Sequence, residues 1–369
     1  GTSATMQVLW NGTTSGTIKV RETNAANCST ETSVITVPIN PVPTPSITGT
    51  AGVCVGATGT YSTAFTAGRT YNWTVTQNGS AIGFTTGANA ATITVQWTAS
   101  GAGQVQVVES VPSTGCSGTS AMYNVSLNPV PTPSIVGNAS TCTGVSTTYS
   151  TAQASNRAYV WTVTPTTATV QGQGTNSITV TFTQAGTGSI SLVETNTQTG
   201  CSTSATPRSI SVGQTPAPVI SGASSVCNTS TTQYTTANTT CCTYNRTVTG
   251  GTITSRNGTN SVQVQWSTLG QQSVNVTETN NGCVGVAQTK QVTVTLQPTP
   301  TITGSASSCA GATSLYNTPQ IGGASYVWSV NGGTIQTSNG VWEIGVIWGN
   351  AGTGSVQVTV TTQQGCTGT

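Results

Sequence analysis

The feature that most constrains the fold is an internal repeat with a period of about 85 residues. The segment Pro-Val-Pro-Thr-Pro-Ser-Ile begins at Pro41 and again at Pro129, and weaker copies lie at 215–220 and 297–302. One series of cysteines, at intervals of 88, 85 and 82 residues, is Cys54, Cys142, Cys227 and Cys309. A second series, at intervals of 88, 85, 82 and 83 residues, is Cys28, Cys116, Cys201, Cys283 and Cys366. This period exceeds that of a solenoid repeat and suits an autonomous β-sandwich domain.

The spacing predicts three whole units between two incomplete ones. We expect whole units at 41–128, 129–213 and 214–296, which are called the first, second and third repeats below. We expect residues 1–40, the N-terminal segment, to be the C-terminal half of a further repeat, and 297–369 to be a fourth repeat that lacks its last strand. No basic and apolar leader precedes the first unit, so either a leader was removed or the sequence is a stretch of a larger protein, and the repeats favour the second interpretation.

Within each unit, apolar and polar residues alternate with the period of two that is typical of strands. Clear examples are Ile93–Trp97, preceded by an aromatic strand at Tyr71–Trp73 and followed by Val105–Val107 after a glycine turn. The segment from Met6 to Trp10 is expected to be an outer copy of the first of these. Helical periodicity is absent. The sequence therefore predicts an all-β protein, a tandem array of seven-stranded antiparallel β-sandwiches of the immunoglobulin type.

The tryptophans of these strands are expected to fill the cores. They alternate with polar residues, as core positions do, whereas a sugar-stacking platform would need aromatic residues on one exposed face. The predicted core tryptophans are Trp73, Trp161, Trp328, Trp97, Trp266 and Trp348.

The order of motifs within a unit carries a resemblance to a known family. The first and second repeats show, in order, Cys-x-Gly, Tyr-Ser, Tyr-x-Trp, Ile-Thr-Val, Gly-x-Gly and Gly-Cys, and the second also has Gly-Gln-Gly-Thr-Asn-Ser at 172–177. This order resembles the PKD-like repeats of secreted Bacteroidota surface proteins. The resemblance implies immunoglobulin-like modules that build stalks, as in gliding-motility adhesins and surface filaments, or act as spacers in secreted enzymes. The chain departs from the pattern because the acidic turn is absent and Arg246 stands where sibling repeats have Trp.

The composition excludes most chemistry. Charged residues make up 4% of the chain, against about 25% in ordinary globular proteins. There is no His, and all six acidic residues are Glu, so a Ser-His-Asp triad, an Asp-based calcium loop and a His-ligated metal site are excluded. A net charge of +2 offers no basic patch for nucleic acid or an anionic membrane surface. No apolar run approaches the length of a membrane span. We therefore expect no enzyme activity, no cofactor, no metal, no nucleic-acid partner and no membrane insertion.

Eleven cysteines indicate an oxidising, extracellular or cell-surface location. If the strands alternate in direction, the two cysteines of one unit lie at opposite poles, roughly 20 Å apart, whereas bridged Cα atoms lie within about 7 Å. Pairing between neighbouring repeats is therefore favoured: Cys54–Cys201, Cys142–Cys283 and Cys227–Cys366. The alternative is pairing within each unit, the commoner pattern in small secreted domains. The remaining cysteines, with partners elsewhere or, for the adjacent pair, a vicinal bridge, are Cys28, Cys116, Cys309, Cys241 and Cys242.

A glutamate recurs at one place near the end of a strand, and its copies are Glu22, Glu109, Glu194 and Glu278. We expect it to accept hydrogen bonds in the adjoining loop, because glycosidase chemistry needs two carboxylates converging on one bond. Arg69 and Arg157 precede the Tyr-x-Trp strands, and we expect them to lie across aromatic surface or to pair with these glutamates.

The function expected from the sequence is a non-enzymatic, structural stalk or filament segment of a large secreted cell-surface protein. The proline-rich linkers are stiff, and the cysteines can lock the junctions. The alternatives are a multivalent glycan- or surface-binding array and a spacer beside a secreted enzyme. Expected partners are neighbouring repeats of the same long chain or fibre, together with glycans or surfaces, because sheet edges that lack charge are poorly guarded against pairing.

Overall fold

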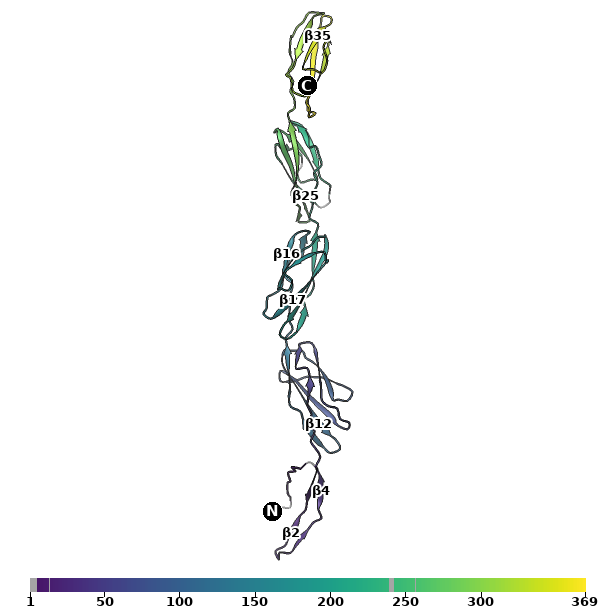
Figure 1. The fold of residues 1–369 in the computed structure, drawn as a ribbon, viewed down its shortest axis with the longest axis vertical. Coiled ribbons are helices and arrows are strands. Elements are labelled where there is room, and N and C mark those ends of the chain that lie inside the picture. The colour runs from purple at the N-terminus through teal and green to yellow at the C-terminus, as the bar shows by residue number, and fades with distance from the viewer. Residues whose placement is uncertain (1–4, 13, 239–241, 256) are drawn as a thin grey trace.

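A computed structural model describes residues 5–12, 14–238, 242–255 and 257–369. The chain is an extended row of small β-sandwiches joined end to end, with the two termini at opposite ends (Figure 1). The described residues contain no helix, and hence none that could span a membrane. The predicted all-β tandem architecture is confirmed.

The second repeat shows how one unit is built. Three strands form one sheet in the order β16-β19-β18, and four form the other in the order β15-β22-β20-β17, with β21 paired to the side of β20. Their bounds are β15 (Ser140–Cys142), β16 (Ser146–Ser150), β17 (Arg157–Thr164), β18 (Thr169–Gln171), β19 (Ser177–Thr181), β20 (Gly186–Asn196), β21 (Ser202–Ser204) and β22 (Arg208–Gly213). Because side chains alternate across a strand, Ile190 and Leu192 of β20 are fully buried between the sheets while their neighbours face outwards.

The first repeat has the same two layers. Its sheets run β10-β11-β7-β5 and β6-β14-β12-β8-β9, with β13 paired to β12. The bounds are β5 (Thr48–Gly49), β6 (Gly52–Cys54), β7 (Thr58–Ser62), β8 (Thr70–Gln77), β9 (Ser80–Ala81), β10 (Thr85–Thr86), β11 (Thr92–Gln96), β12 (Gly101–Val111), β13 (Cys116–Thr119) and β14 (Tyr123–Asn128).

The third and fourth repeats follow the same plan. The third has sheets β23-β30-β28-β25 and β24-β27-β26, with β29 paired to β28, and the fourth has β31-β32-β35-β34 and β33-β36-β37. In the third repeat the bounds are β23 (Ser225–Cys227), β24 (Thr231–Thr235), β25 (Cys242–Val248), β26 (Gly251–Ile253), β27 (Ser261–Trp266), β28 (Gly270–Asn280), β29 (Cys283–Val284) and β30 (Gln288–Thr295). In the fourth they are β31 (Thr303–Gly304), β32 (Thr313–Asn317), β33 (Ser325–Asn331), β34 (Gly333–Ile335), β35 (Glu343–Trp348), β36 (Ser355–Thr361) and β37 (Thr367–Gly368).

One strand pair departs from the antiparallel expectation. The first strand of each whole repeat changes sheets, so that its second half pairs in parallel with the last strand: β6 with β14, β15 with β22, and β23 with β30. In the first repeat the earlier half, β5, pairs antiparallel with β7 in the opposite sheet. The parallel pair places both of its strands along the same direction of the rod.

The N-terminal segment forms only short hairpin pairs. β1 (Ser15–Ile18) pairs with β4 (Ile35–Pro38), and β2 (Arg21–Thr23) pairs with β3 (Ser29–Glu31). The expectation of a strand at Met6–Trp10 is wrong, since this stretch has no regular structure and Leu9 is 87% exposed. Within the described part of this segment, the two strand pairs are separate two-stranded sheets, and neither includes residues 6–10.

Five of the six predicted core tryptophans are buried where the alternation places them. Trp73, Trp161 and Trp328 are at least 95% buried, and their indole N–H groups donate to the carbonyl oxygens of loop residues in the same repeat. Trp97 and Trp266 are fully buried. In the fourth repeat, by contrast, Trp348 is only partly buried.

Candidate functional site: the junctions between repeats

The structure brings six of the predicted cysteines together across the boundaries between repeats. Three disulfides join Cys54 to Cys201, Cys142 to Cys283 and Cys227 to Cys366. In each, the Cα atoms are 5.6 Å apart, the ordinary separation for a bridged pair. These are the pairs that alternating strand directions favoured, and none joins two cysteines of the same repeat.

Strand register explains why these cysteines meet. Cys142 ends β15 and lies opposite Gly213, the last residue of β22, in the parallel pair. The linker to the third repeat begins after Gly213. Cys283, the first residue of β29 in that repeat, lies next to Gly213. A Cβ added to Gly213 would lie 2.5 Å from the Cys283 Sγ, so glycine makes room for the bond.

The disulfides and linkers together make two covalent threads along the rod. One thread runs from Cys54 through the disulfide to Cys201, along β22 and β23, and through Cys227 to Cys366. The other follows β14 and β15 and crosses through Cys142 to Cys283 and β30. Each junction between whole repeats is therefore crossed by one backbone linker and one disulfide. Inside a repeat, the two threads are the parallel strand pair described above.

Hydrogen bonds tie each linker to the repeat that it leaves. The backbone N–H of Thr215 donates to Thr143 Oγ1 at 2.9 Å, and the Thr215 hydroxyl donates back to the Thr143 carbonyl. One junction further on, the Gln297 N–H donates to the Asn228 side chain. Its side-chain amide donates at 3.2 Å to the Thr367 carbonyl of the fourth repeat. The linker to the fourth repeat is thus hydrogen-bonded to the repeats on both of its sides.

A second glycine, two residues after the hairpin cysteine, packs against the linker. A Cβ on Gly118 would overlap the Pro43 carbonyl, and one on Gly368 would overlap the Pro298 carbonyl. Gly285 stands 2.5 Å from the Pro216 carbonyl by the same measure. The second repeat has Thr203 at this position. In the sequence, the signal for this contact is the spacing Cys-x-Gly in the second cysteine series, which was not used to predict it.

The other cysteines lie at related places. The Cys116 Sγ is 3.9 Å from the Asn40 carbonyl oxygen, and the Cys201 Sγ lies 4.0 Å from the Asn128 carbonyl, which is the matching position one repeat later. Cys28 and Cys309 are exposed. Cys242 begins β25, while Cys241 and the expectation of a vicinal bridge lie outside the described residues.

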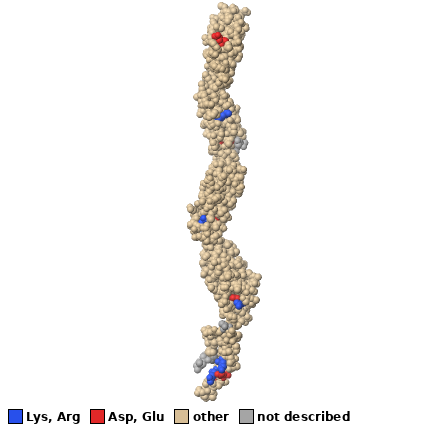
Figure 2. Space-filling view, viewed as in Figure 1, with Lys and Arg blue, Asp and Glu red and all other residues tan. Residues whose placement is uncertain are grey.

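Near each junction, a recurring glutamate closes the pole of the sandwich. Arg69 donates to Glu109, and Arg157 forms an ion pair with Glu194, both at 2.8 Å. Both glutamates are more than 90% buried. The expected pairing of these arginines with the glutamates is confirmed. Charged groups are otherwise sparse on the surface and gather at the N-terminal segment, where Lys19 pairs with Glu31 (Figure 2).

Arg246 takes the place of the core tryptophan in the third repeat. It is 98% buried, and its guanidinium donates to the Thr259 and Asn260 carbonyls and to the Thr236 hydroxyl. It also lies 5.4 Å from the centre of the Tyr244 ring. Burial lowers the pKa of Arg246, and the charges of Tyr244 and Glu278 oppose that shift.

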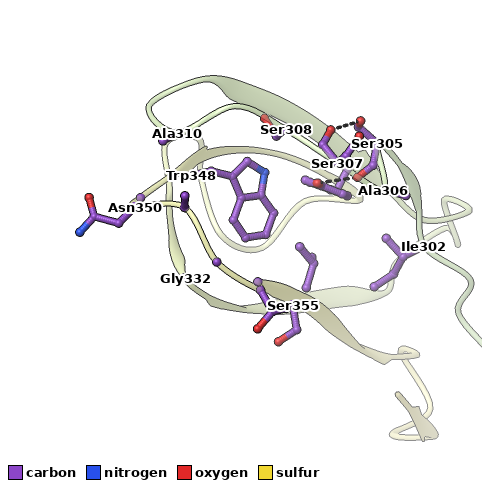
Figure 3. Close-up of a pocket in the computed structure, with 17 residues that line it drawn as sticks. Ile302, Ser305, Ala306, Ser307, Ser308, Ala310, Gly332, Trp348, Asn350 and Ser355 are labelled. Atoms are coloured by element: carbon purple, nitrogen blue, oxygen red, sulfur yellow. Dashed lines mark hydrogen bonds between the residues drawn. The ribbon is translucent and has the colours of Figure 1, made fainter.

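A cavity of about 430 Å³ opens in the fourth repeat beside Trp348 (Figure 3). It lies between the segment 302–310 and the exposed edge of β36, the place that β30 occupies between β23 and β28 in the third repeat. Among the described residues no strand fills this position, which leaves the Trp348 indole partly uncovered. The cavity thus matches the place of a missing last strand.

Comparison with known proteins identifies the repeat. A family model described as the PKD-like domain matches residues 40–125, 128–212 and 295–369, about two thirds of the chain. The chain belongs to the PKD-like domain family. The matched ranges fall on the first, second and fourth repeats, and the third shares their sheet order. No curated protein matches the chain.

Several solved structures are similar in fold at low identity. The fibronectin(III)-like modules of CbhA from Clostridium thermocellum are 15% identical, with a TM-score of 0.26, covering 46% of this chain and 94% of theirs. SGBP-B from Bacteroides ovatus, solved with a mixed-linkage heptasaccharide, is 14% identical, with a TM-score of 0.18, covering 85% and 87%. The ICAM-5 D1–D4 ectodomain fragment is 11% identical, with a TM-score of 0.30, covering 86% and 98%. At these TM-scores, the likeness carries no argument about function.

Proposed function

We propose that this chain is a load-bearing, non-enzymatic stalk segment of a large secreted or cell-surface protein of the adhesin type. The repeat boundaries at 41–128, 129–213, 214–296 and 297–369 are part of this proposal. Structural disulfides persist in oxidising, extracellular compartments, which supports the location. Within the proposal, the immediate partners are neighbouring repeats of the same long chain or fibre.

The observation that carries the proposal is the pair of covalent threads through the junctions. Along the first thread, only the 26 residues from Cys201 to Cys227 separate the two disulfides. Fully extended, that backbone reaches about 90 Å, whereas the 312 residues between Cys54 and Cys366 would reach about 1,100 Å once both disulfides are reduced.

The consequence is that the remaining strands bear little tension. Residues 55–200 and 228–365 form loops closed by a disulfide, so unfolding them adds no length to the first thread. A tandem array without such bonds would lengthen each time one domain unfolds. The arrangement keeps the rod at its folded length under load, which is the property that a stalk requires.

Single-molecule pulling between the chain ends tests the proposal. We expect the oxidised chain to show no unfolding steps from the region between Cys54 and Cys366, and the reduced chain to release roughly 1,000 Å of hidden contour length in several steps. The variant Cys54→Ser serves as a control, because it opens the first loop and leaves Cys227–Cys366 intact. Equal extension of oxidised and reduced chains would contradict a load-bearing role for the disulfides.

A further inference from the structure

The third repeat differs from its siblings at the glutamate that closes the pole. In the first and second repeats, Glu109 pairs with Arg69, which directly precedes β8, and Glu194 pairs with Arg157, the first residue of β17. In the third repeat, the residue in register with Arg157 is Cys242, since Arg157 lies opposite Asn196 and Cys242 lies opposite Asn280. A cysteine side chain is shorter than arginine and carries no positive charge.

Glu278 stays buried although its arginine is missing. The residue is 94% buried, as its siblings are, and its carboxylate receives no hydrogen bond or ion pair from any residue that the structure describes. Because Glu278 lines a cavity and its carboxylate has no donor from the described chain, the site is suited to a cationic partner.

A cavity of about 650 Å³ lies against this glutamate, at the junction between the second and third repeats. Its walls are the linker at 214–219, the end of β24 at 235–237, and Glu278 with Asn280 from β28. Apart from Glu278, no charged residue of the described chain lines it. The cavity is large enough for a side chain of arginine size.

Arg246 does not fill the missing role. No ion pair within 4.0 Å joins it to Glu278 among the described residues, because its N–H groups donate to Thr236, Thr259 and Asn260 instead. The charge of Glu278 opposes the lowering of the Arg246 pKa that burial causes, so the two groups attract each other at longer range. The hydrogen-bonding capacity of the carboxylate remains unused.

We propose that this cavity is a binding site for a guanidinium group, supplied by an arginine side chain of a partner polypeptide that docks at the junction. The entering guanidinium occupies the place that Arg69 and Arg157 hold in the sibling repeats and forms an ion pair with Glu278, as they do with Glu109 and Glu194. The repeat that lost its internal arginine is thereby the one that recognises an external one. The site goes beyond the stalk role and does not depend on it.

The test uses the full oxidised chain, labelled with ¹⁵N, and capped arginine (N-acetyl-L-arginine methylamide) as the probe. We expect saturable amide shifts confined to the cavity, at Thr236, Glu278 and Asn280. Capped citrulline, the neutral isostere, should bind at least about tenfold more weakly, since its ureido group keeps N–H donors but lacks the positive charge that pairs with Glu278. Capped lysine should bind more weakly than arginine, because it lacks the planar fork.

Two variants and a sibling provide matched controls. Glu278→Gln should weaken binding about tenfold or more, and Cys242→Arg should abolish it by filling the site internally. Arg157→Ala should create an equivalent site at Glu194 in the second repeat, seen as new shifts on β20. Amide shifts elsewhere report whether each variant is folded.

Three outcomes would overturn the site. They are equal binding of arginine and citrulline, unchanged binding in folded Cys242→Arg, and the absence of new shifts in folded Arg157→Ala. Should Glu278→Gln fail to fold, the citrulline comparison and the other two variants still decide the question. None of these results bears on the pulling experiment, so the two proposals succeed or fail separately.

Discussion

The second and third repeats have the same sheet order but distribute one positive charge differently. The second repeat has an apolar plug, Trp161, in its core and an arginine, Arg157, at its pole. The third has arginine in the core and cysteine at the pole. Each repeat keeps one arginine for its buried glutamate, but only in the second repeat does it reach the carboxylate. The fold therefore tolerates either position for the cation, and the choice decides whether the pole is closed or open.

The largest effect in this comparison is expected from removing the apolar plug. Trp161→Ala should destabilise the second repeat by about 3–5 kcal/mol, because it deletes a large buried side chain and leaves a cavity. Urea unfolding followed by hydrogen exchange at β17 and β20 would measure the loss. Thr162→Ala, an exposed neighbour on the same strand, should change stability by less than about 0.5 kcal/mol. A loss below about 1 kcal/mol for Trp161→Ala would show that this tryptophan does not support the core.

The next prediction exchanges the two arrangements within the third repeat. Arg246→Trp alone removes a buried cation but leaves Glu278 buried without a balancing charge, so little stability should be gained. Adding Cys242→Arg restores the sibling arrangement. The double variant should be more stable than the sum of the single changes by about 1–3 kcal/mol, measured as the coupling energy of a double-mutant cycle in urea. Additive single effects would mean that positions 242 and 246 act independently.

The sequence alone predicted much of this comparison. Period-two alternation at Ile93–Trp97 specified the layers, and cysteine spacing with alternating strand direction favoured the pairs that the structure joins. Arg246 was recognised as standing in place of tryptophan. The parallel pairing of β6 with β14 was not foreseen, because Gly52–Cys54 is too short to show alternation and its sheet is decided by the partner strands.

The opening at Glu278 was also missed, for a physical reason. The opening follows from Cys242 being in register with Arg157, which only the strand pairing shows. In the sequence, the adjacent cysteines at 241 and 242 indicate a disulfide and not the absence of an arginine. The short strands β13, β21 and β29 escaped notice because each contains at most four residues and is defined by pairing across a turn. A residue pattern shows which side chains a strand buries. It does not show a cavity that is left where a side chain is shorter than its counterpart in a sibling repeat.

A smaller effect is expected from the glutamates themselves. Glu194→Gln should cost about 1–3 kcal/mol, because it takes the charged acceptor from the half-buried Arg157. Glu278→Gln should cost less by about 1 kcal/mol or more, since no donor reaches its carboxylate in the described chain. Thermal unfolding of the two full-chain variants at matched salt would compare them. Equal losses would indicate that Glu278 already has a donor as effective as Arg157.

The smallest effect concerns the residue that packs on the linker. Gly285→Ala should cost about 1 kcal/mol, because the new methyl group meets the Pro216 carbonyl and the linker must move. Thr203→Gly, the reverse change in the second repeat, should cost about 0.5–1 kcal/mol through lost strand propensity alone. Chemical unfolding gives both values. The rate at which dithiothreitol reduces the nearby disulfide separates a displaced linker from a loss of strand propensity, since only a displaced linker exposes the bond. In Gly285→Ala, the reduction of Cys142–Cys283 should become faster. In Thr203→Gly, the reduction of Cys54–Cys201 should stay unchanged. Faster reduction in both variants would mean that the hairpin strand itself protects these disulfides from reduction, and that the contact between glycine and linker does not.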